Sequence, residues 1–177
     1  MGKNLKGSRT ERNLQEAFIG ESKARNKYTY FASKAKKEGY VQISKIFEET
    51  AVNEKEHAKI WFKLLDGIGD TAKNLKNSLE SEYYEWTEMY PSFAKIAREE
   101  GFNEIAVLFE MVANIEKTHY EQYLKLLETI EKGKVFESDN DEIWQCSNCG
   151  HIVIGKKAPA ICPVCRHPKD YFEIKKS

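Results

Sequence analysis

The sequence has little proline, no excess of either charge and no long apolar run. It contains four prolines, and its 28 basic and 28 acidic residues balance. Because the charges are interspersed, as on solvated helix faces, the sequence favours neither a nucleic-acid nor an anionic membrane partner. No stretch of about 18 apolar residues exists, so no membrane span is predicted. The first residues also lack an apolar signal core, and we expect a cytoplasmic protein.

Cysteine is absent from the first 145 residues, and its four copies then form two Cys-x-x-Cys pairs, Cys146 with Cys149 and Cys162 with Cys165. In a reducing compartment this pattern predicts one tetrahedral metal site rather than disulfides. The spacing alone fits structural zinc and a single redox iron equally well. Because the four-cysteine set is complete, the two nearby histidines at 151 and 167 are expected on the surface.

Long helical segments precede the cysteines. Glycines at 39, 67, 101 and 133 end four segments with helical periodicity, each near 25–30 residues long. Long helices with short connections predict an antiparallel four-helix bundle. We expect this bundle over residues 1–134, a linker over 135–142 and a small metal-stapled β domain over 143–177, because about 35 residues cannot build an adequate core alone.

The helical part contains an internal repeat with an offset of 62 residues. Twelve of the 28 positions from 38 to 65 are identical in the second copy. The repeat duplicates a Glu-x-x-His motif, Glu54 with His57 and Glu116 with His119, whose spacing places both side chains on one helix face. Each motif interrupts an apolar stripe, where a buried charge costs several kcal/mol unless it is compensated. A bound metal ion would compensate it.

The repeat slips by one residue in the third helical segment. Glu21 lies seven residues before Tyr28, whereas Glu82 lies eight before Tyr90. One extra residue in a helix is accommodated as a π-bulge, often at a functional site. We therefore predict a π-bulge between Glu82 and Tyr90, with Glu82 and Glu85 both turned inward. We also predict a kink at the following Pro91, which lacks an N–H donor.

Together these positions form the di-iron carboxylate pattern, with one Glu on each of two helices and Glu-x-x-His on the other two. The candidate ligands are Glu21, Glu54, His57, Glu82, Glu85, Glu116 and His119. Carboxylate and imidazole suit iron or manganese. Since a di-iron site needs an electron supply, iron is favoured over zinc on the four cysteines. Tyr28 and Tyr90 could either hydrogen-bond ligand carboxylates or pack in the core, and Trp61 and Trp86 are interpreted as core packing.

These residues resemble the rubrerythrin family over nearly the whole chain, from about 5 to 175. The stretches that carry the resemblance are 5–11, 20–26, 54–58, 85–94 and 162–165. The resemblance implies a ferritin-like bundle with two non-haem irons, followed by a rubredoxin-like domain with one iron on four thiolates. It further implies an oxidative-stress peroxidase that reduces hydrogen peroxide to water with electrons passed through the rubredoxin-like centre.

The resemblance also implies ligand roles. Glu54 and Glu116 match carboxylates that bridge the two irons. Glu21 matches a ligand of one iron, and Glu82 and His119 match ligands of the other.

Four further roles follow from the same resemblance. Glu85 matches an additional carboxylate that simple ferritins lack, and His57 matches a histidine that exchanges with this carboxylate as the first iron changes redox state. Tyr28 and Tyr90 match tyrosines that support the ligands.

The expected partners are hydrogen peroxide and an electron-donor protein, a rubredoxin or its reductase, that links the reaction to NAD(P)H. A homodimer or higher oligomer is expected, with electron transfer across the interface. Two alternatives remain: a ferritin-like ferroxidase that handles iron, and a binding protein whose four-cysteine domain holds zinc.

Overall fold

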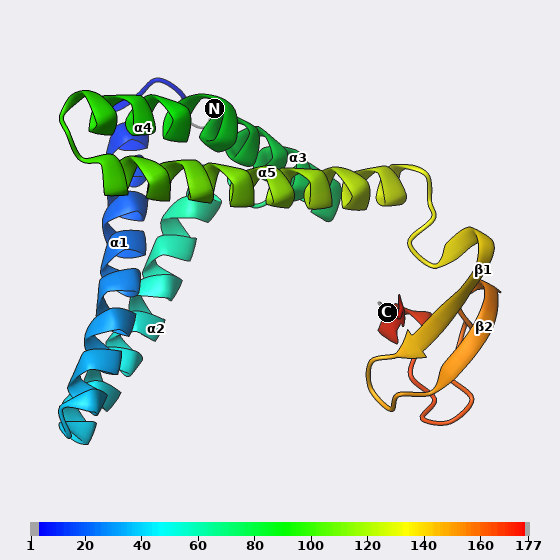
Figure 1. Cartoon of the computed structure of the whole chain (residues 1–177). Coiled ribbons are helices and arrows are strands. Elements are labelled where there is room, and N and C mark those ends of the chain that lie inside the picture. The colour runs from blue at the N-terminus through cyan, green and yellow to red at the C-terminus, as the bar shows by residue number, and fades with distance from the viewer. Residues whose placement is uncertain (1–3, 176–177) are drawn as a thin grey trace. The chain divides into compact units, whose positions relative to one another are not determined.

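The computed structural model describes residues 4–175 and divides the chain into two compact units, Met1–Gly69 and Asp70–Ser177 (Figure 1). The ends of the predicted domains at residues 1 and 177 lie outside the described residues. The first unit is a helical hairpin of α1 (Arg9–Lys37) and α2 (Val41–Leu64), which pack side by side. Ser8 caps α1, because its hydroxyl accepts the Glu11 N–H at 3.0 Å.

The second unit begins with a continuous helical segment of α3 (Thr71–Tyr84), the π-helical η1 (Glu85–Met89) and α4 (Tyr90–Glu99). Helix α5 (Asn103–Glu131) returns against all three. The π-helical turn lies where the one-residue slip predicts it, so that prediction is confirmed. Pro91 is the second residue of α4, directly after η1, so one carbonyl of the preceding helical turn lacks its N–H donor. The kink there stays a prediction.

The two helical hairpins turn in the same way. Gly39 and Gly101 both have φ of 86°, in the left-handed region that L side chains disfavour. The residue after each glycine donates its N–H to a carbonyl in the last turn of the helix. Tyr40 donates to Ala35 at 2.9 Å, and the equivalent Phe102 donates to Ala97 at 2.7 Å. The two copies of the repeat therefore share the backbone hydrogen bonds that end α1 and α4, as well as their sequence.

Small buried residues hold each hairpin together. Ala32, Ala35 and Ser44 are buried between α1 and α2, and their repeat counterparts Ala94, Ala97 and Ala106 are buried between α4 and α5. Aromatic packing repeats too: the rings at 31 and 47 lie 5.7 Å apart, and those at 93 and 109 lie 5.6 Å apart. Small residues let the helices approach closely, which brings side chains of neighbouring helices within reach of one metal ion.

The last part of the chain is a three-stranded antiparallel sheet in the order β2-β1-β3. Its strands are β1 (Glu137–Cys146), β2 (Ile152–Lys157) and β3 (Phe172–Ile174), with the 3-10 turn η2 (Lys169–Tyr171) before the last. A helical part followed by a small antiparallel sheet confirms the predicted fold class. Strand β1 starts inside the stretch expected to be a linker, and its pairing with β2 is irregular between Glu137 and Glu142. The domain boundaries themselves stay predictions.

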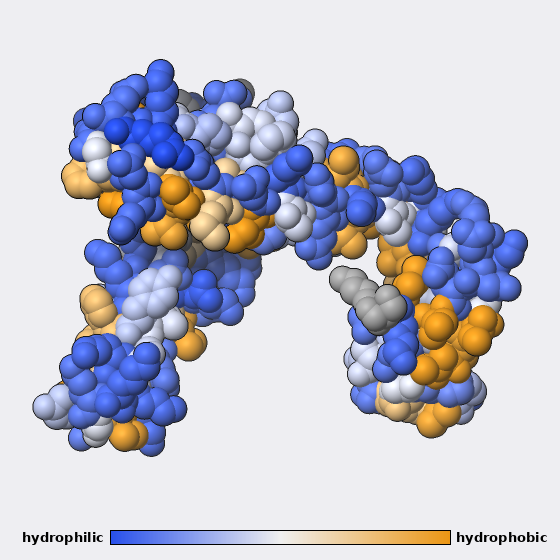
Figure 2. All heavy atoms as spheres, in the orientation of Figure 1, coloured by the Kyte–Doolittle hydropathy of each residue, from blue (hydrophilic) through white to orange (hydrophobic). Residues whose placement is uncertain are grey.

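The core of the small domain is very small. Trp144, Cys146 and Cys162 are fully buried, and Phe172 packs with them. The single sheet has no second layer that could cover both of its faces, so Ile143 and two isoleucines of β2 remain exposed. Figure 2 shows apolar residues gathered on this domain. Two of the four core side chains are thus metal-ligand candidates. Among the described residues, no helix combines the length and apolar character needed to cross a membrane.

Replacing Trp144 with alanine is expected to destabilise the small domain by about 3–5 kcal/mol. The indole is fully buried, and its N–H donates to the Gly155 carbonyl at 2.8 Å. Thermal unfolding of the metal-loaded protein, followed by absorption of the cysteine site, measures the loss. Exposed Ile154 on the same sheet gives the matched control, since I154A should change the midpoint little. Equal midpoints for W144A and I154A would contradict the prediction.

Candidate metal centres

Helices α1 and α2 bring together a first cluster, defined as Glu21, Glu54 and His57. One donor atom from each residue lies within 4.8 Å of the others. His57 Nδ1 lies 2.9 Å from Glu54 Oε2 and 4.0 Å from Glu21 Oε1. The carboxylates are mostly buried, whereas the imidazole is about half exposed, at 52%. The three-residue spacing of Glu54 and His57 on α2 and the packing of α2 against α1 produce this convergence.

Helices α3 and α5 form the equivalent second cluster, defined as Glu82, Glu116 and His119. Its donor atoms also lie within 4.8 Å of one another. His119 Nδ1 lies 2.6 Å from Glu116 Oε2 and 3.7 Å from Glu82 Oε2. The structure therefore groups six of the seven predicted ligands into two sets of the same composition.

The charges within each cluster favour a bound cation. A hydrogen bond with Glu54 raises the pKa of Glu21, and burial and the Glu54 charge add to this effect. Burial raises the pKa of Glu82, followed by the charge of Glu116. Two carboxylates in a partly buried site disfavour each other's ionised form unless a cation neutralises them. Carboxylate oxygens with one imidazole are donors that suit iron, so the residues fit the group that the sequence predicts.

In the metal-free protein, Glu82→Gln is expected to raise the unfolding free energy at pH 7. Folding raises the pKa of Glu82 above its ordinary value of 4.5. The protonated carboxyl group therefore favours the folded state below pH 4.5, and this stabilisation is lost as the pH rises through the pKa of Glu82 in the folded protein. The neutral amide of glutamine removes the cost of ionising this side chain in the folded protein. A gain of about 1 kcal/mol would raise the melting temperature by about 2–4 °C in a chain of this size.

Melting of metal-free wild type, E82Q and E80Q at pH 5 and pH 7 tests this expectation. Glu80 is exposed two residues earlier on α3, so E80Q should retain the wild-type pH dependence. If wild type and E82Q lose the same stability between pH 5 and pH 7, the account of Glu82 is wrong.

Glu85 lies outside the second cluster but close to it. It is half-buried in η1, and the Ser81 hydroxyl donates to its Oε1 at 3.5 Å. After burial, the Glu85 charge is the next largest influence that raises the pKa of Tyr90, ahead of Glu116 and Glu82. The charges of the second cluster thus act on the phenol of Tyr90. Sequence reasoning missed Ser81, although its position one helical turn before Glu85 indicates such a contact.

The two predicted supporting tyrosines occupy equivalent places. Tyr28 packs at 6.0 Å from the Phe47 ring, and Tyr90 packs at 6.0 Å from the Phe109 ring. Both are half-buried; Tyr28 lies on α1 with Glu21, and Tyr90 lies at the start of α4, which follows α3 and η1 without a break. Their role towards the ligands stays a prediction.

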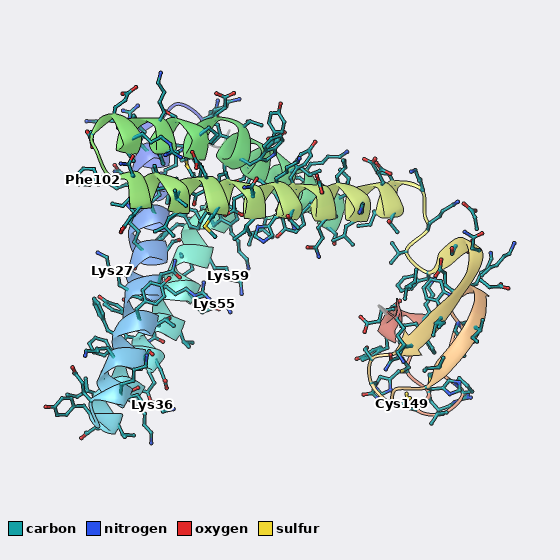
Figure 3. The ribbon with its side chains drawn as sticks, viewed as in Figure 1. Lys27, Lys36, Lys55, Lys59, Phe102 and Cys149 are labelled. Atoms are coloured by element: carbon teal, nitrogen blue, oxygen red, sulfur yellow. The ribbon has the colours of Figure 1, made fainter. Side chains whose placement is uncertain are left out.

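The four cysteines converge at one end of the small sheet, where Figure 3 labels Cys149 in the loop after β1. Sulfur–sulfur distances are 3.7 Å for Cys146 with Cys165 and 3.7 Å for Cys149 with Cys162. A tetrahedral metal with metal–sulfur bonds of about 2.3 Å separates its sulfurs by about 3.8 Å. The arrangement therefore fits a four-thiolate metal site.

Backbone N–H groups support the thiolate form in this cluster. The N–H of His167 donates to Cys165 and, with further donors among the neighbouring side chains, lowers the pKa of Cys165 to about 5. Thiolate is the form that binds metal. His151 and His167 are not among the grouped ligand atoms, as predicted, but both residues are half-buried where surface positions were expected.

Comparison with known proteins assigns the family. A family model described as rubrerythrin matches residues 12–127, and one described as rubrerythrin, rubredoxin-like domain matches residues 144–173. The chain belongs to the rubrerythrin family. The match confirms the ferritin-like and rubredoxin-like domains, the di-iron centre and the four-cysteine iron site as the cofactor set of this chain. Members of the rubrerythrin family are oxidoreductases.

Relatives match the chain over its whole length. A rubrerythrin of Porphyromonas gingivalis is 50% identical, with 100% of this chain and 95% of that protein covered. A rubrerythrin of Nitratidesulfovibrio vulgaris is 50% identical, with 97% of each covered. The chain is also similar to a solved structure of fully reduced, all-ferrous nigerythrin, at 33% identity, with 98% and 90% covered and a TM-score of 0.36. The roles of individual ligands stay predictions.

Proposed function

We propose that this member of the rubrerythrin family reduces hydrogen peroxide to water. The observation that carries the proposal is the presence, in one chain, of two matching Glu/Glu/His clusters and a four-cysteine cluster with tetrahedral sulfur spacing. The overall change consumes one peroxide, two protons and two electrons and yields two waters. The carboxylate clusters would hold two irons that supply the electron pair when bound, and the four cysteines would hold a third iron that passes electrons to them.

The chain's own residues would hold the metals and the protons. In this proposal Glu54 and Glu116 would be ligands shared by the two irons, Glu21 would hold one iron, and Glu82 and His119 would hold the other. These carboxylates and the imidazole also fix where peroxide can bind.

Two further residues distinguish the two sides of the proposed centre. Glu85 and His57 would be alternative ligands of the first iron. Tyr90 keeps its phenol proton, because burial and the nearby carboxylates raise its pKa, and can donate a hydrogen bond within the site. The proposal assigns no side chain as a nucleophile.

The proposed electron source is a separate protein, a rubredoxin or its reductase, linked to NAD(P)H. We also propose a cytoplasmic homodimer or higher oligomer. The exposed Cys149 supports access of an electron donor to the four-cysteine site, because a ligand at the surface shortens the distance over which an electron must pass.

Anaerobic peroxide consumption by the iron-loaded, chemically reduced protein tests the function. The expected result is one peroxide consumed per two electrons, with catalytic turnover when reductant is renewed. The alternative, a ferritin-like ferroxidase, predicts instead that ferrous iron is oxidised and accumulates as mineral. Mineral accumulation without peroxide turnover would favour the alternative and reject the peroxidase.

A further inference from the structure

The two cysteine loops of the small domain, the first over 146–151 and the second over 162–167, have nearly the same backbone. In the first loop, the N–H of the leading cysteine donates to the histidine carbonyl at 2.8 Å, and the Gly150 N–H donates back to that cysteine's carbonyl at 2.8 Å. In the second loop, the equivalent hydrogen bonds are 2.8 Å and 3.0 Å long, and Arg166 stands in the place of Gly150. The two loops thus differ at this position in side chain rather than in backbone.

Gly150 and Arg166 both adopt the left-handed backbone conformation, with φ of 76° and 63°. Glycine reaches this region freely, whereas a Cβ makes it unfavourable. Among the described residues, the other non-glycine residue with positive φ is Asp66, and short side chains such as aspartate occupy this region more often than most. Residues held in rarely populated conformations gather at functional sites, so an arginine here calls for an explanation.

Arg166 also carries the only full charge in the cysteine loops, because neither loop contains another Lys, Arg, Asp or Glu. Its side chain is exposed and forms no ion pair within residues 4–175, the part of the chain that the structure describes. The residue follows Cys165 directly, so the two Cα atoms lie about 3.8 Å apart. An unpaired cation therefore belongs to the immediate neighbour of a metal-ligand candidate.

Reduction changes the net charge of the four-cysteine site. Four thiolates with a ferric ion sum to one negative charge, whereas four thiolates with a ferrous ion sum to two. A nearby cation stabilises the more negative form, and net charge is one of the factors that set the reduction potential of iron–thiolate sites. We propose that Arg166 raises the reduction potential of the four-cysteine iron. The inference rests on iron in this site and not on the proposed reduction of peroxide.

Spectroelectrochemistry of the full iron-loaded chain measures this potential through the visible absorption of the ferric four-thiolate site. R166Q keeps a long polar side chain without the charge and should lower the potential. For unit charges about 10 Å apart near a protein surface, the attraction changes a redox equilibrium constant by about 2-fold to 10-fold, and a tenfold change corresponds to about 59 mV for one electron. R166K restores the charge and should retain the wild-type potential. Equal potentials for R166Q and wild type would overturn the inference.

Lys156 provides the matched control for loss of one positive charge. Ile152 of β2 pairs with Gln145, the residue before the first cysteine loop, and Lys156 lies four residues farther along the strand. That separation is about 13 Å at the usual strand rise. K156Q should therefore lower the potential less than R166Q does. A shift in K156Q as large as that in R166Q would show that the net charge of the domain, rather than Arg166, sets the potential.

Salt separates an effect of charge from an effect of packing. Because the Arg166 side chain is exposed, dissolved ions screen its field over about 10 Å at 0.1 M ionic strength and about 3 Å at 1 M. The difference in potential between wild type and R166Q should therefore shrink as salt rises over this range. A difference that stays the same would indicate a packing effect and reject the inference.

The first loop permits the reverse experiment. Apart from its chain neighbours, a Cβ at Gly150 would meet no heavy atom within 4 Å, so a side chain fits there although φ is unfavourable. G150R places a second cation at the equivalent position and should raise the potential. G150A introduces the same backbone strain without the charge and should leave the potential unchanged. Equal potentials for G150R and G150A would contradict the inference.

R166G separates the backbone conformation from the charge. Glycine removes the unfavourable left-handed arginine, so the thermal midpoint of the iron-loaded protein should rise while the potential falls. A potential that falls in a more stable protein cannot result from a damaged site. A higher midpoint with an unchanged potential would reject the role of the charge.

Discussion

Replacing Glu54 with alanine is expected to lower kcat/KM for peroxide by at least about 100-fold and to remove iron from the helical domain. Loss of a partner behind a metal ligand already costs about 10–100-fold, so loss of a bridging ligand should cost no less. Glu54 is also the group that His57 contacts at 2.9 Å and the main influence on the pKa of Glu21. Its removal therefore disturbs every member of the first cluster.

Glu56→Ala is the matched control on the same helix. Glu56 is exposed, and its partner is Lys59 at 3.3 Å, a surface pair worth about 0–1 kcal/mol. E56A should keep both its iron and its activity. Iron analysis and steady-state peroxide consumption compare the two variants, and circular dichroism confirms that they are folded. Full activity of E54A with its iron retained would reject Glu54 as a ligand.

Cys162→Ser is expected to separate the two halves of the proposed reaction. Cys162 is fully buried, and its sulfur lies 3.7 Å from that of Cys149. A hydroxyl is a poor substitute for a soft thiolate, so the visible absorption of the ferric four-thiolate site should disappear. Steady-state peroxide reduction with an external donor protein should then fall by about 100-fold or more, in line with the loss of a metal ligand. Chemically reduced protein should still complete a single turnover, because the carboxylate clusters are unchanged.

Ser147→Ala is the matched control for this variant. Ser147 follows Cys146, and its hydroxyl donates to the Tyr171 carbonyl at 3.0 Å, a hydrogen bond worth about 1 kcal/mol. S147A should retain the absorption and the rate. Steady-state turnover of C162S at the wild-type rate would show that electrons reach the helical domain without the cysteine site.

Much of the helical architecture could be predicted because a few positions determine it locally. Gly39 and Gly101 end their helices because each adopts φ of 86°, which other residues avoid. The π-helical turn follows from counting seven residues between one pair of repeat positions and eight between the other. The four-cysteine metal site could be predicted from the spacing of the cysteines alone. In each case the physical constraint acts over a few neighbouring residues.

Other features depend on contacts that the sequence does not show. Strand β1 begins at Glu137, in an acidic stretch without the alternation of a typical strand. Its first residue pairs with Lys157 at 2.9 Å, 20 residues away, so β2 determines where the strand starts. Likewise, the buried indole N–H of Trp61 has no hydrogen-bond partner among the described residues. Residue type on one helix cannot show that an indole N–H will lack a partner.

The π-helical turn of η1 has a consequence for how the duplicated hairpins correspond. Each residue added to an α-helix rotates everything after it by about 100°. An extra residue between Glu82 and Tyr90 would therefore carry Tyr90 and Phe93 away from Phe109, yet their ring contacts match those of the first hairpin. The wider turn absorbs that rotation within five residues. The two hairpins therefore differ in length by one residue, yet the side chains after the π-helical turn keep the same rotational register as their counterparts. The additional residue lies in the segment that contains Glu85.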